Sequence, residues 1–224
     1  MEIAWFGSYC FRIRNRNSIA LVDPYLPDPK YQNLQIKADV ISISQIGRKI
    51  RKVVPNQREA VYRVERPGEY EIGGIFIDAI PVTITSEEQG SENLHPIAVT
   101  LTLDDLTVCH LGQLDNVPSS SIIEQLGSPD ILILPAGGTE NLTCEQSVKL
   151  VKSLSPAYVI PISHPDPDSL ATSSIDKFIK ELGVEKPEIA NNLNISRGGI
   201  THDVTSVVLL QSRTREKRPP GENA

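Results

Sequence analysis

Histidine is scarce in this sequence. The 224 residues contain four, and the first of them is His95. A cluster of imidazoles in the first third of the chain is therefore excluded. Cysteine is also rare: Cys10, Cys109 and Cys144 are widely spaced and form no Cys-x-x-Cys pair. This pattern is typical of free thiols in a reducing compartment, and it predicts a cytoplasmic protein without disulfides.

Long hydrophobic runs and an excess of positive charge are also missing. No apolar run approaches the roughly 20 residues that a membrane span needs, and the first residues lack the basic and apolar regions of a signal peptide. The formal net charge is −6 and aromatic residues make up 5% of the chain, which argues against a general nucleic-acid surface. We expect a soluble globular protein with neither a membrane nor a nucleic acid as partner.

The first half of the chain is rich in strand patterns. Short alternating or β-branched runs predict strands at 3–6, 10–14, 18–22, 40–44, 60–64, 74–80, 97–103 and 106–111. Turn residues separate these runs, and Asp104-Asp105 is expected to form a hairpin turn. This half therefore predicts sheets rather than helices.

In the second half, helices alternate with apolar strands. A capping box predicts a helix that opens at Ser121 and ends at Gly127. A second capping box, Thr143 with Gln146, opens a helix that stops before Pro156. Further elements are expected as a helix at 174–182 and as strands at 130–134, 158–162, 193–196 and 206–211. We predict one α/β layered domain over 1–212 and a disordered charged tail over 213–224.

Sequence landmarks follow one another along nearly the whole chain, at 5–11, 22–25, 38–44, 108–112, 134–138 and 159–162. The most distinctive is the run Pro67-Gly68-Glu69-Tyr70-Glu71-Ile72-Gly73-Gly74. Together they resemble the metallo-β-lactamase fold superfamily, in particular the branch of Zn-dependent hydrolases that includes L-ascorbate-6-phosphate lactonase. The resemblance implies a four-layer αββα sandwich with mixed sheets, and an active site along one edge where the strands end.

The metal motif of that family is absent after the strand at 40–44. The family carries His-x-His-x-Asp-His there, and the matching positions of this chain are Gln45, Gly47, Lys49 and Ile50. Glycine and isoleucine have no ligating side chain, and glutamine is a poor zinc ligand. A protonated lysine repels a dication. The first metal motif is therefore degenerate.

Three further family positions have also changed. The aspartate that follows His-Leu-Gly in the family is Gln113, and the last histidine position is Ser163. The histidine that the branch often has after Gly7 is Ser8. The resemblance thus implies the fold, whereas the residues argue against the family's binuclear metal site.

The remaining candidates are single residues at strand ends. His164, with Asp23, Asp115 and Asp166, could hold one metal ion weakly, or it could be a solvated loop histidine among turn-forming aspartates. Asp23 alone is expected to cap a turn and orient a loop. His110 could be a ligand or base, or a strand histidine hydrogen-bonded to backbone. The neighbouring Cys109 cannot pair with it, because adjacent strand residues face opposite sides.

The densest basic cluster of the chain follows the degenerate motif. It consists of Arg48, Lys49, Arg51 and Lys52. These side chains could bind a phosphate or carboxylate, or they could form a solvated basic loop.

Three hypotheses remain for function, and the sequence leaves open whether the protein is an enzyme. The first is a non-catalytic pseudo-hydrolase without a metal, with a binding or interaction role. The second is an altered hydrolase with one weakly held Zn or Mn at His164, or a metal-free site built on Lys49 and His110. The third is a small-anion sensor that uses the basic cluster. A homo-oligomer is compatible with each of them.

Overall fold

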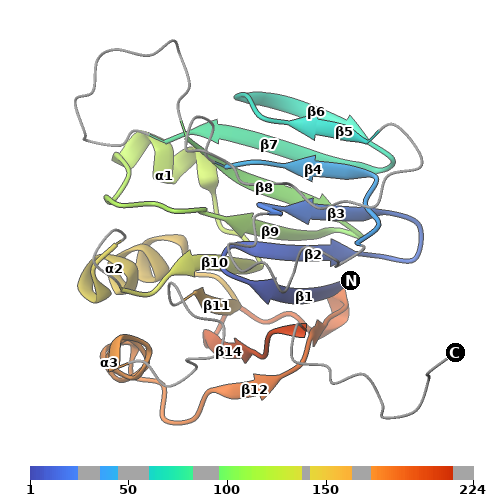
Figure 1. The fold of residues 1–224 in the computed structure, drawn as a ribbon. Coiled ribbons are helices and arrows are strands. Elements are labelled where there is room, and N and C mark those ends of the chain that lie inside the picture. The colour runs from blue at the N-terminus through green and yellow to red at the C-terminus, as the bar shows by residue number, and fades with distance from the viewer. Residues whose placement is uncertain (25–35, 45–60, 83–95, 138–141, 163–172, 214–224) are drawn as a thin grey trace, which may run out of the picture.

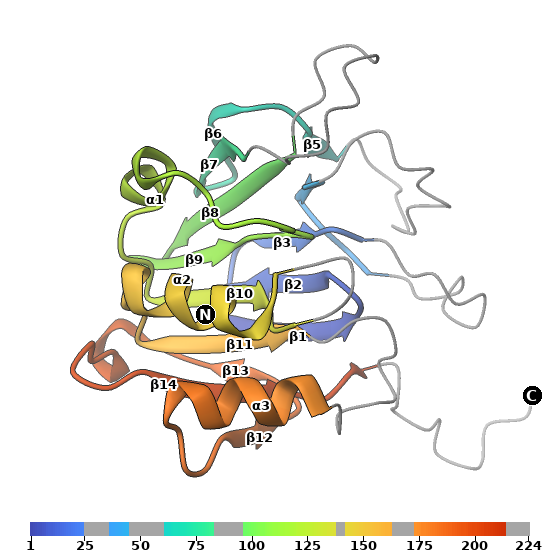
Figure 2. The same cartoon turned by 90° about the vertical axis from the view of Figure 1, so that its left-hand side faces the viewer.

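A computed structural model describes residues 1–24, 36–44, 61–82, 96–137, 142–162 and 173–213 of the chain. In these residues two β-sheets pack against each other, and α-helices cover the outer face of the larger sheet (Figures 1 and 2). No helix within the described ranges is long and apolar enough to cross a membrane.

The smaller sheet is built mostly from the first part of the chain. Its strands are β1 (Glu2–Gly7), β2 (Cys10–Arg14), β3 (Ile19–Val22), β4 (Val40–Ser42), β5 (Tyr62–Val64) and β13 (Leu193–Asn194). They lie in the order β13-β1-β2-β3-β4-β5. The pairs from β13 to β3 are antiparallel, whereas β3, β4 and β5 run parallel, so the sheet is mixed.

The larger sheet is also mixed. Its strands are β6 (Gly68–Ile72), β7 (Ile75–Pro81), β8 (Ile97–Leu103), β9 (Leu106–His110), β10 (Ile131–Pro135), β11 (Tyr158–Ile162), β12 (Glu188–Ala190) and β14 (Ser206–Leu210). They lie in the order β12-β14-β11-β10-β9-β8-β7-β6. Strands β6 to β9 form an antiparallel meander, and the strands from β9 to β12 are parallel neighbours. The turn at Asp104-Asp105 joins β8 to β9 as predicted.

The described helices are α1 (Ser120–Leu126), α2 (Cys144–Leu154), α3 (Ser173–Leu182) and the short 3₁₀ helix η2 (Arg197–Gly199). The capping box at α2 is confirmed, because Thr143 accepts from the backbone of Gln146 and the Gln146 side chain accepts in return. The capping box expected at Ser121 is wrong. Helix α1 begins one residue earlier, its N-cap Ser119 makes no side-chain cap bond, and Ser121 lies inside the first turn.

Alternating side chains of the two sheets form the main core. Inward residues of β1, β2 and β3 meet those of β7, β8 and β9, among them Phe11, Ile13, Ile77 and Leu101. The opposite side of the larger sheet packs on α1, α2 and α3. Three of the four predicted layers are therefore present in the described residues, and the mixed α/β class with two mixed sheets confirms the predicted fold class. The tail at 214–224 lies outside the described residues.

Chain direction distinguishes two edges of the sandwich. Strands β3 and β9 end at the strand-end edge, next to Asp23 and at His110. They begin at the turn edge, next to the turns at 15–18 and 104–105. The Asn15 amide donates to the Asp104 carboxylate at 2.9 Å, so these two turns from different sheets are in contact. Because catalytic sites favour the carboxyl ends of strands in layered α/β folds, the strand-end edge is the first place to look for function.

Candidate functional site

Two of the predicted site residues meet at the strand-end edge. Asp23 follows β3 of the smaller sheet and is 8% exposed, and His110 ends β9 of the larger sheet and is fully buried. Oδ2 of Asp23 lies 3.7 Å from Nδ1 of His110. The two sheets therefore bring a carboxyl group and an imidazole together from positions 87 residues apart in the sequence.

Both carboxyl oxygens of Asp23 are bound by one serine. The backbone N–H of Ser44 donates to Oδ1 at 2.6 Å, and its hydroxyl donates to Oδ2 at 2.6 Å. Asp23 has a left-handed backbone (φ 43°), which an aspartate tolerates better than most residues. These contacts tie the end of β3 to the residue that precedes the degenerate motif. In the sequence, Ser44 is marked only by its place at the end of an apolar run.

His110 is bound to backbone through one ring nitrogen. The N–H of Gly112 donates to Nδ1 at 3.1 Å, so the proton of the neutral ring resides on Nε2. Nε2 is buried and makes no hydrogen bond of ordinary geometry within the described residues, although the Tyr9 backbone interacts with the ring. The ring also stands edge-on to Phe11, with centroids 5.6 Å apart. This arrangement agrees with the backbone-bonded alternative for His110.

Gly112 leaves the space that the Ser44 side chain occupies beside Asp23. Its φ is +59°, and a Cβ at this position would overlap the Ser44 hydroxyl and lie 2.7 Å from the Ser44 Cβ. It would also lie 3.7 Å from Oδ2 of Asp23. Only glycine fits here without displacing Ser44. The glycine was visible in the sequence after His-Leu, but its close approach to residue 44 was not.

Burial shifts the pKa values of Asp23 and His110 in opposite directions. Desolvation raises the pKa of Asp23 to about 6, although the hydrogen bonds from Ser44 lower it. Desolvation lowers the pKa of His110 to about 3, with the Tyr9 backbone acting in the other direction. In both cases burial favours the neutral form. At neutral pH the site therefore holds an uncharged imidazole beside a carboxylate that is costly to charge.

The remaining described candidates add little to this pair. Gln113 lines a small enclosed hollow together with Ser44 and Leu111. Oδ1 of Asp115 is buried and has no hydrogen-bond partner among the residues that the structure describes. Burial raises the pKa of Cys109 to about 12, and this side chain packs under the helices, whereas His110 faces Phe11 of the inter-sheet core. The structure therefore keeps Cys109 and His110 apart and leaves the thiol protonated.

The described donor set does not fit a metal centre of the family type. Both oxygens of Asp23 accept from Ser44, and His110 offers a single nitrogen. Within the described ranges no three His, Cys, Asp or Glu residues converge as a metal site would require. The other site positions of the sequence prediction lie outside these ranges: Gln45, Gly47, Arg48, Lys49, Ile50, Arg51, Lys52, Ser163, His164 and Asp166.

Comparison with known proteins places residues 2–163 in the beta-lactamase superfamily domain family. A protein of Methanocaldococcus jannaschii named UPF0173 metal-dependent hydrolase is 27% identical over 223 residues, which cover 86% of this chain and 100% of that protein. A UPF0173 protein of Pyrococcus abyssi is 26% identical over 204 residues, covering 81% of this chain and 90% of the relative.

Solved structures share the fold. A protein of Thermotoga maritima, assigned as a Zn-dependent hydrolase of the metallo-beta-lactamase superfamily, superposes with a TM-score of 0.73 at 22% identity. That match covers 93% of this chain and 97% of the other. An isothiocyanate hydrolase from Delia radicum gut bacteria superposes with a TM-score of 0.62 at 16% identity, over 88% of this chain and 100% of that one. At these identities the likeness concerns the fold alone.

Proposed function

The chain belongs to the metallo-β-lactamase superfamily, and we propose that it keeps the fold of that family but has lost the family's metal-dependent hydrolysis. It then acts as a pseudo-hydrolase whose role is to bind a ligand or partner. Its relatives include proteins named as metal-dependent hydrolases. The proposal is that this chain lacks the activity that those names describe.

The observation that carries the proposal is the set of residues at the family's ligand positions, and the bonding of the described strand-end residues agrees with it. A catalytic metal needs several free nitrogen and oxygen ligands that converge at ~2.0–2.2 Å. Asp23 instead has both oxygens bound to Ser44, and His110 is fully buried with Nδ1 bound to Gly112. These residues serve to hold two sheets and a loop together.

The sequence supports the same conclusion at the motif itself. Gln45, Gly47, Lys49 and Ile50 stand where the family has three histidines and an aspartate, and Gln113 replaces a further aspartate. These four side chains cannot hold a zinc ion, so the metal-bound hydroxide that the family uses as nucleophile cannot form. We infer that the ligand of the binding role is a small anion, held by Arg48, Lys49, Arg51 and Lys52.

We also propose a cytoplasmic location. Cys10, Cys109 and Cys144 are all free, buried thiols. Thiols persist in this state in a reducing compartment. A homo-oligomer remains compatible with this proposal.

The deciding experiment measures metal in the purified, untagged protein. The protein is dialysed against trace Zn and Mn and analysed by elemental mass spectrometry. We expect well below one metal ion per chain. One or two ions per chain would overturn the proposal.

A matched variant makes that measurement a positive test. Gln45→His, Gly47→His, Lys49→Asp, Ile50→His and Gln113→Asp together restore the family's ligand types in this chain. The restored variant is expected to take up more metal than the parent under identical dialysis. Equal, near-stoichiometric loading of both would show that the parent has another metal site, and the pseudo-hydrolase proposal would be wrong.

The alternative function is an altered metal-dependent hydrolase of the lactonase-like branch. Two observations favour it: the names of the relatives, and the buried Nε2 of His110, which makes no hydrogen bond of ordinary geometry with the described residues. Asp23 and His164 are the further residues that this alternative would use for one weakly held Zn or Mn. Its test is His164→Ala, which must lower metal content and any ester or phosphodiester hydrolysis, whereas His202→Ala must leave both unchanged.

A further inference from the structure

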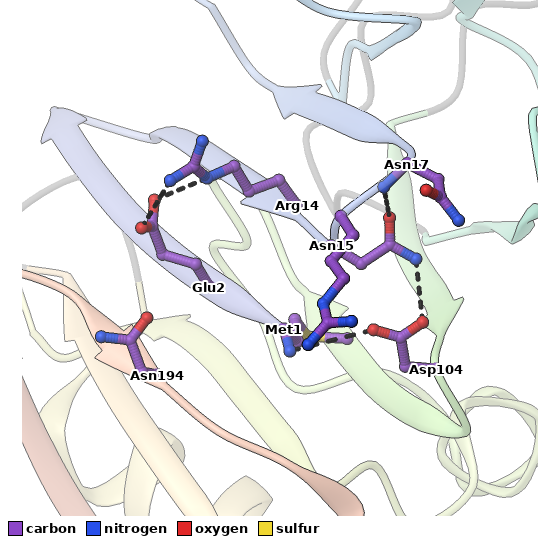
Figure 3. Close-up of a pocket in the computed structure, with 8 residues that line it drawn as sticks. Met1, Glu2, Arg14, Asn15, Asn17, Asp104 and Asn194 are labelled. Atoms are coloured by element: carbon purple, nitrogen blue, oxygen red, sulfur yellow. Dashed lines mark hydrogen bonds and ion pairs between the residues drawn. The ribbon is translucent and has the colours of Figure 1, made fainter.

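The turn edge carries a polar hollow that the proposed function does not use. It is open to solvent and has a volume of about 640 Å³. Residues from β1, from β2 and the turn after it, from the β8–β9 turn and from β13 line it, and Figure 3 shows them around one opening. Those used below are Glu2, Arg14, Arg16, Asn17, Asp104 and Asn194.

The hollow is locally cationic in an acidic protein. Arg14 binds Glu2 with two parallel hydrogen bonds, from Nε at 3.0 Å and from Nη2 at 2.9 Å. Arg12 donates to the same carboxylate at 2.7 Å, and Arg213 lies 3.7 Å from it. One carboxylate therefore faces three guanidinium groups. The lining itself holds Arg14 and Arg16 against Glu2 and Asp104, so the excess of positive charge comes from Arg12 and Arg213, which contact Glu2 without lining the hollow. The whole chain, by contrast, has a net charge of −6.

Several polar side chains of this hollow are not engaged elsewhere. The side chains of Arg16, Asn17 and Asn194 are exposed and make no hydrogen bond or ion pair with the described residues. A guanidinium and two carboxamides present N–H donors, and a guanidinium matches the geometry of a phosphate or carboxylate. The hollow therefore offers free donors on a background of positive charge.

The charges of the rim limit the size of the anion. Asp104 stands at the rim and its Oδ1 already accepts from Asn15 at 2.9 Å. Its negative charge repels a long polyanion and tolerates a small one that sits beside Arg16. We propose that this hollow is an anion site for a small phosphate-type oxyanion, on the opposite edge of the sandwich from Asp23 and His110.

The test is a titration of ¹⁵N-labelled protein with inorganic phosphate and pyrophosphate at low ionic strength. We expect saturable binding that shifts the side-chain amide resonances of Asn17 and Asn194. Citrate is titrated in a parallel arm, because a carboxylate could satisfy the same donors. Binding of citrate but not of phosphate or pyrophosphate would overturn the assignment to the phosphate class.

Three variants sharpen the titration. Arg16→Ala is expected to weaken pyrophosphate binding about tenfold, as the loss of one charge-assisted hydrogen bond does. Arg66→Ala removes the same charge from an exposed arginine in the connection between β5 and β6, and must leave binding unchanged. Asp104→Asn keeps an acceptor for Asn15 and removes a negative charge, so it must tighten binding about threefold.

Other results overturn the proposal. If Arg16→Ala and Arg66→Ala bind pyrophosphate equally, or if the amide resonances of Asn17 and Asn194 do not move, the hollow is not the site. A phosphate response that disappears only when Arg48, Lys49, Arg51 and Lys52 are replaced would assign the anion to the basic cluster instead. Metal content does not enter this test, so the pseudo-hydrolase proposal can fail while this one stands.

Discussion

Two buried aspartates, one at each edge of the sandwich, have pKa values that are shifted in opposite directions. Asp130, at the turn edge, is 3% exposed, and Asp23, at the strand-end edge, is 8% exposed. Burial alone raises the pKa of both groups. For Asp130 this effect is outweighed by the Thr107 backbone, His202 and Arg197, so its pKa falls below the usual range. For Asp23 it is not outweighed, and the pKa rises to about 6.

The difference lies in the cations and donors around each carboxylate. Asp130 accepts from the Thr107 N–H at 2.9 Å and from Arg197 at 2.7 Å, and it contacts His202 Nε2 at 3.2 Å. Within the described part of the chain, the Asp23 carboxylate accepts hydrogen bonds from Ser44, and the imidazole beside it is neutral. The contacts of Asp130 thus stabilise its charged form, whereas burial makes the charged form of Asp23 unfavourable.

The two edges also differ in how the sheets are joined. At the turn edge, Asn15 donates to Asp104 and the Ser18 hydroxyl donates to the Gly73 carbonyl. Both bonds link a turn of the smaller sheet to a turn of the larger one. At the strand-end edge, Asp23 of the smaller sheet lies 3.7 Å from His110 of the larger one, and the Ser44 side chain that binds Asp23 occupies the space left by Gly112.

The largest expected effect comes from a steric overlap introduced at the strand-end edge. Gly112→Ala should lower the free energy of unfolding by about 4 kcal/mol, because the new Cβ overlaps Ser44 and the backbone remains left-handed. Gly127→Ala is the control: its φ is +67°, but a Cβ there meets nothing within 4 Å. It should cost only about 1 kcal/mol. Denaturant unfolding measures both, and equal losses would contradict the role of Gly112.

The next effect tests the raised pKa of Asp23. A carboxyl group whose folded pKa lies above its unfolded pKa binds protons more tightly when folded, so the wild type gains stability as pH falls from about 6 to 4. Asp23→Asn lacks this gain. Its unfolding free energy relative to wild type should therefore fall by roughly 2.5 kcal/mol between pH 7 and pH 4. A difference that stays flat over this range would refute the raised pKa.

At the turn edge, the pH dependence of the stability difference between wild type and Asp130→Asn should have the opposite sign. Because the folded pKa of Asp130 lies below its unfolded value, its stabilisation is present at neutral pH and is lost as pH falls through the folded pKa. Asp130→Asn should lower the unfolding free energy by about 2 kcal/mol at pH 7. This deficit should shrink below pH 4. A deficit that persists at pH 2.5 would show that packing, and not charge, carries the effect.

The smallest effect concerns His202, which contacts both Asp130 and the Ser155 carbonyl. Its side chain is 39% exposed, so solvent screens the contact. His202→Gln should lower the unfolding free energy by about 0.5 kcal/mol at pH 6. In a double-mutant cycle with Asp130→Asn the two changes should be non-additive. Full additivity would indicate that His202 contributes nothing through Asp130.

Local sequence patterns predicted most of the fold correctly. The capping box at Thr143 and Gln146 is complete within four residues, so it could be recognised without tertiary information. Strand β12, with only Glu188, Ile189 and Ala190, was not predicted because three residues show no periodicity. Strand β6 was not predicted as a strand because its residues are mostly exposed and polar and two of its neighbours are glycines.

The candidate site was predicted only residue by residue. Asp23 and His110 were each named, but their contact joins two sheets and depends on how those sheets pack. The roles of Ser44 and Gly112 depend on that same packing, and no local pattern encodes it. Long-range contacts of this kind cannot be derived from spacing along one strand.

The pairing of β1 with β13 has a consequence for how the protein folds. Glu2 lies opposite Asn194 and Ile3 opposite Leu193, so this pair closes a loop of nearly the whole described chain. Closing so long a loop is entropically costly until the intervening strands have assembled. We expect β13 to dock after the transition state. Substitutions such as Leu193→Ala should then accelerate unfolding while leaving the folding rate almost unchanged.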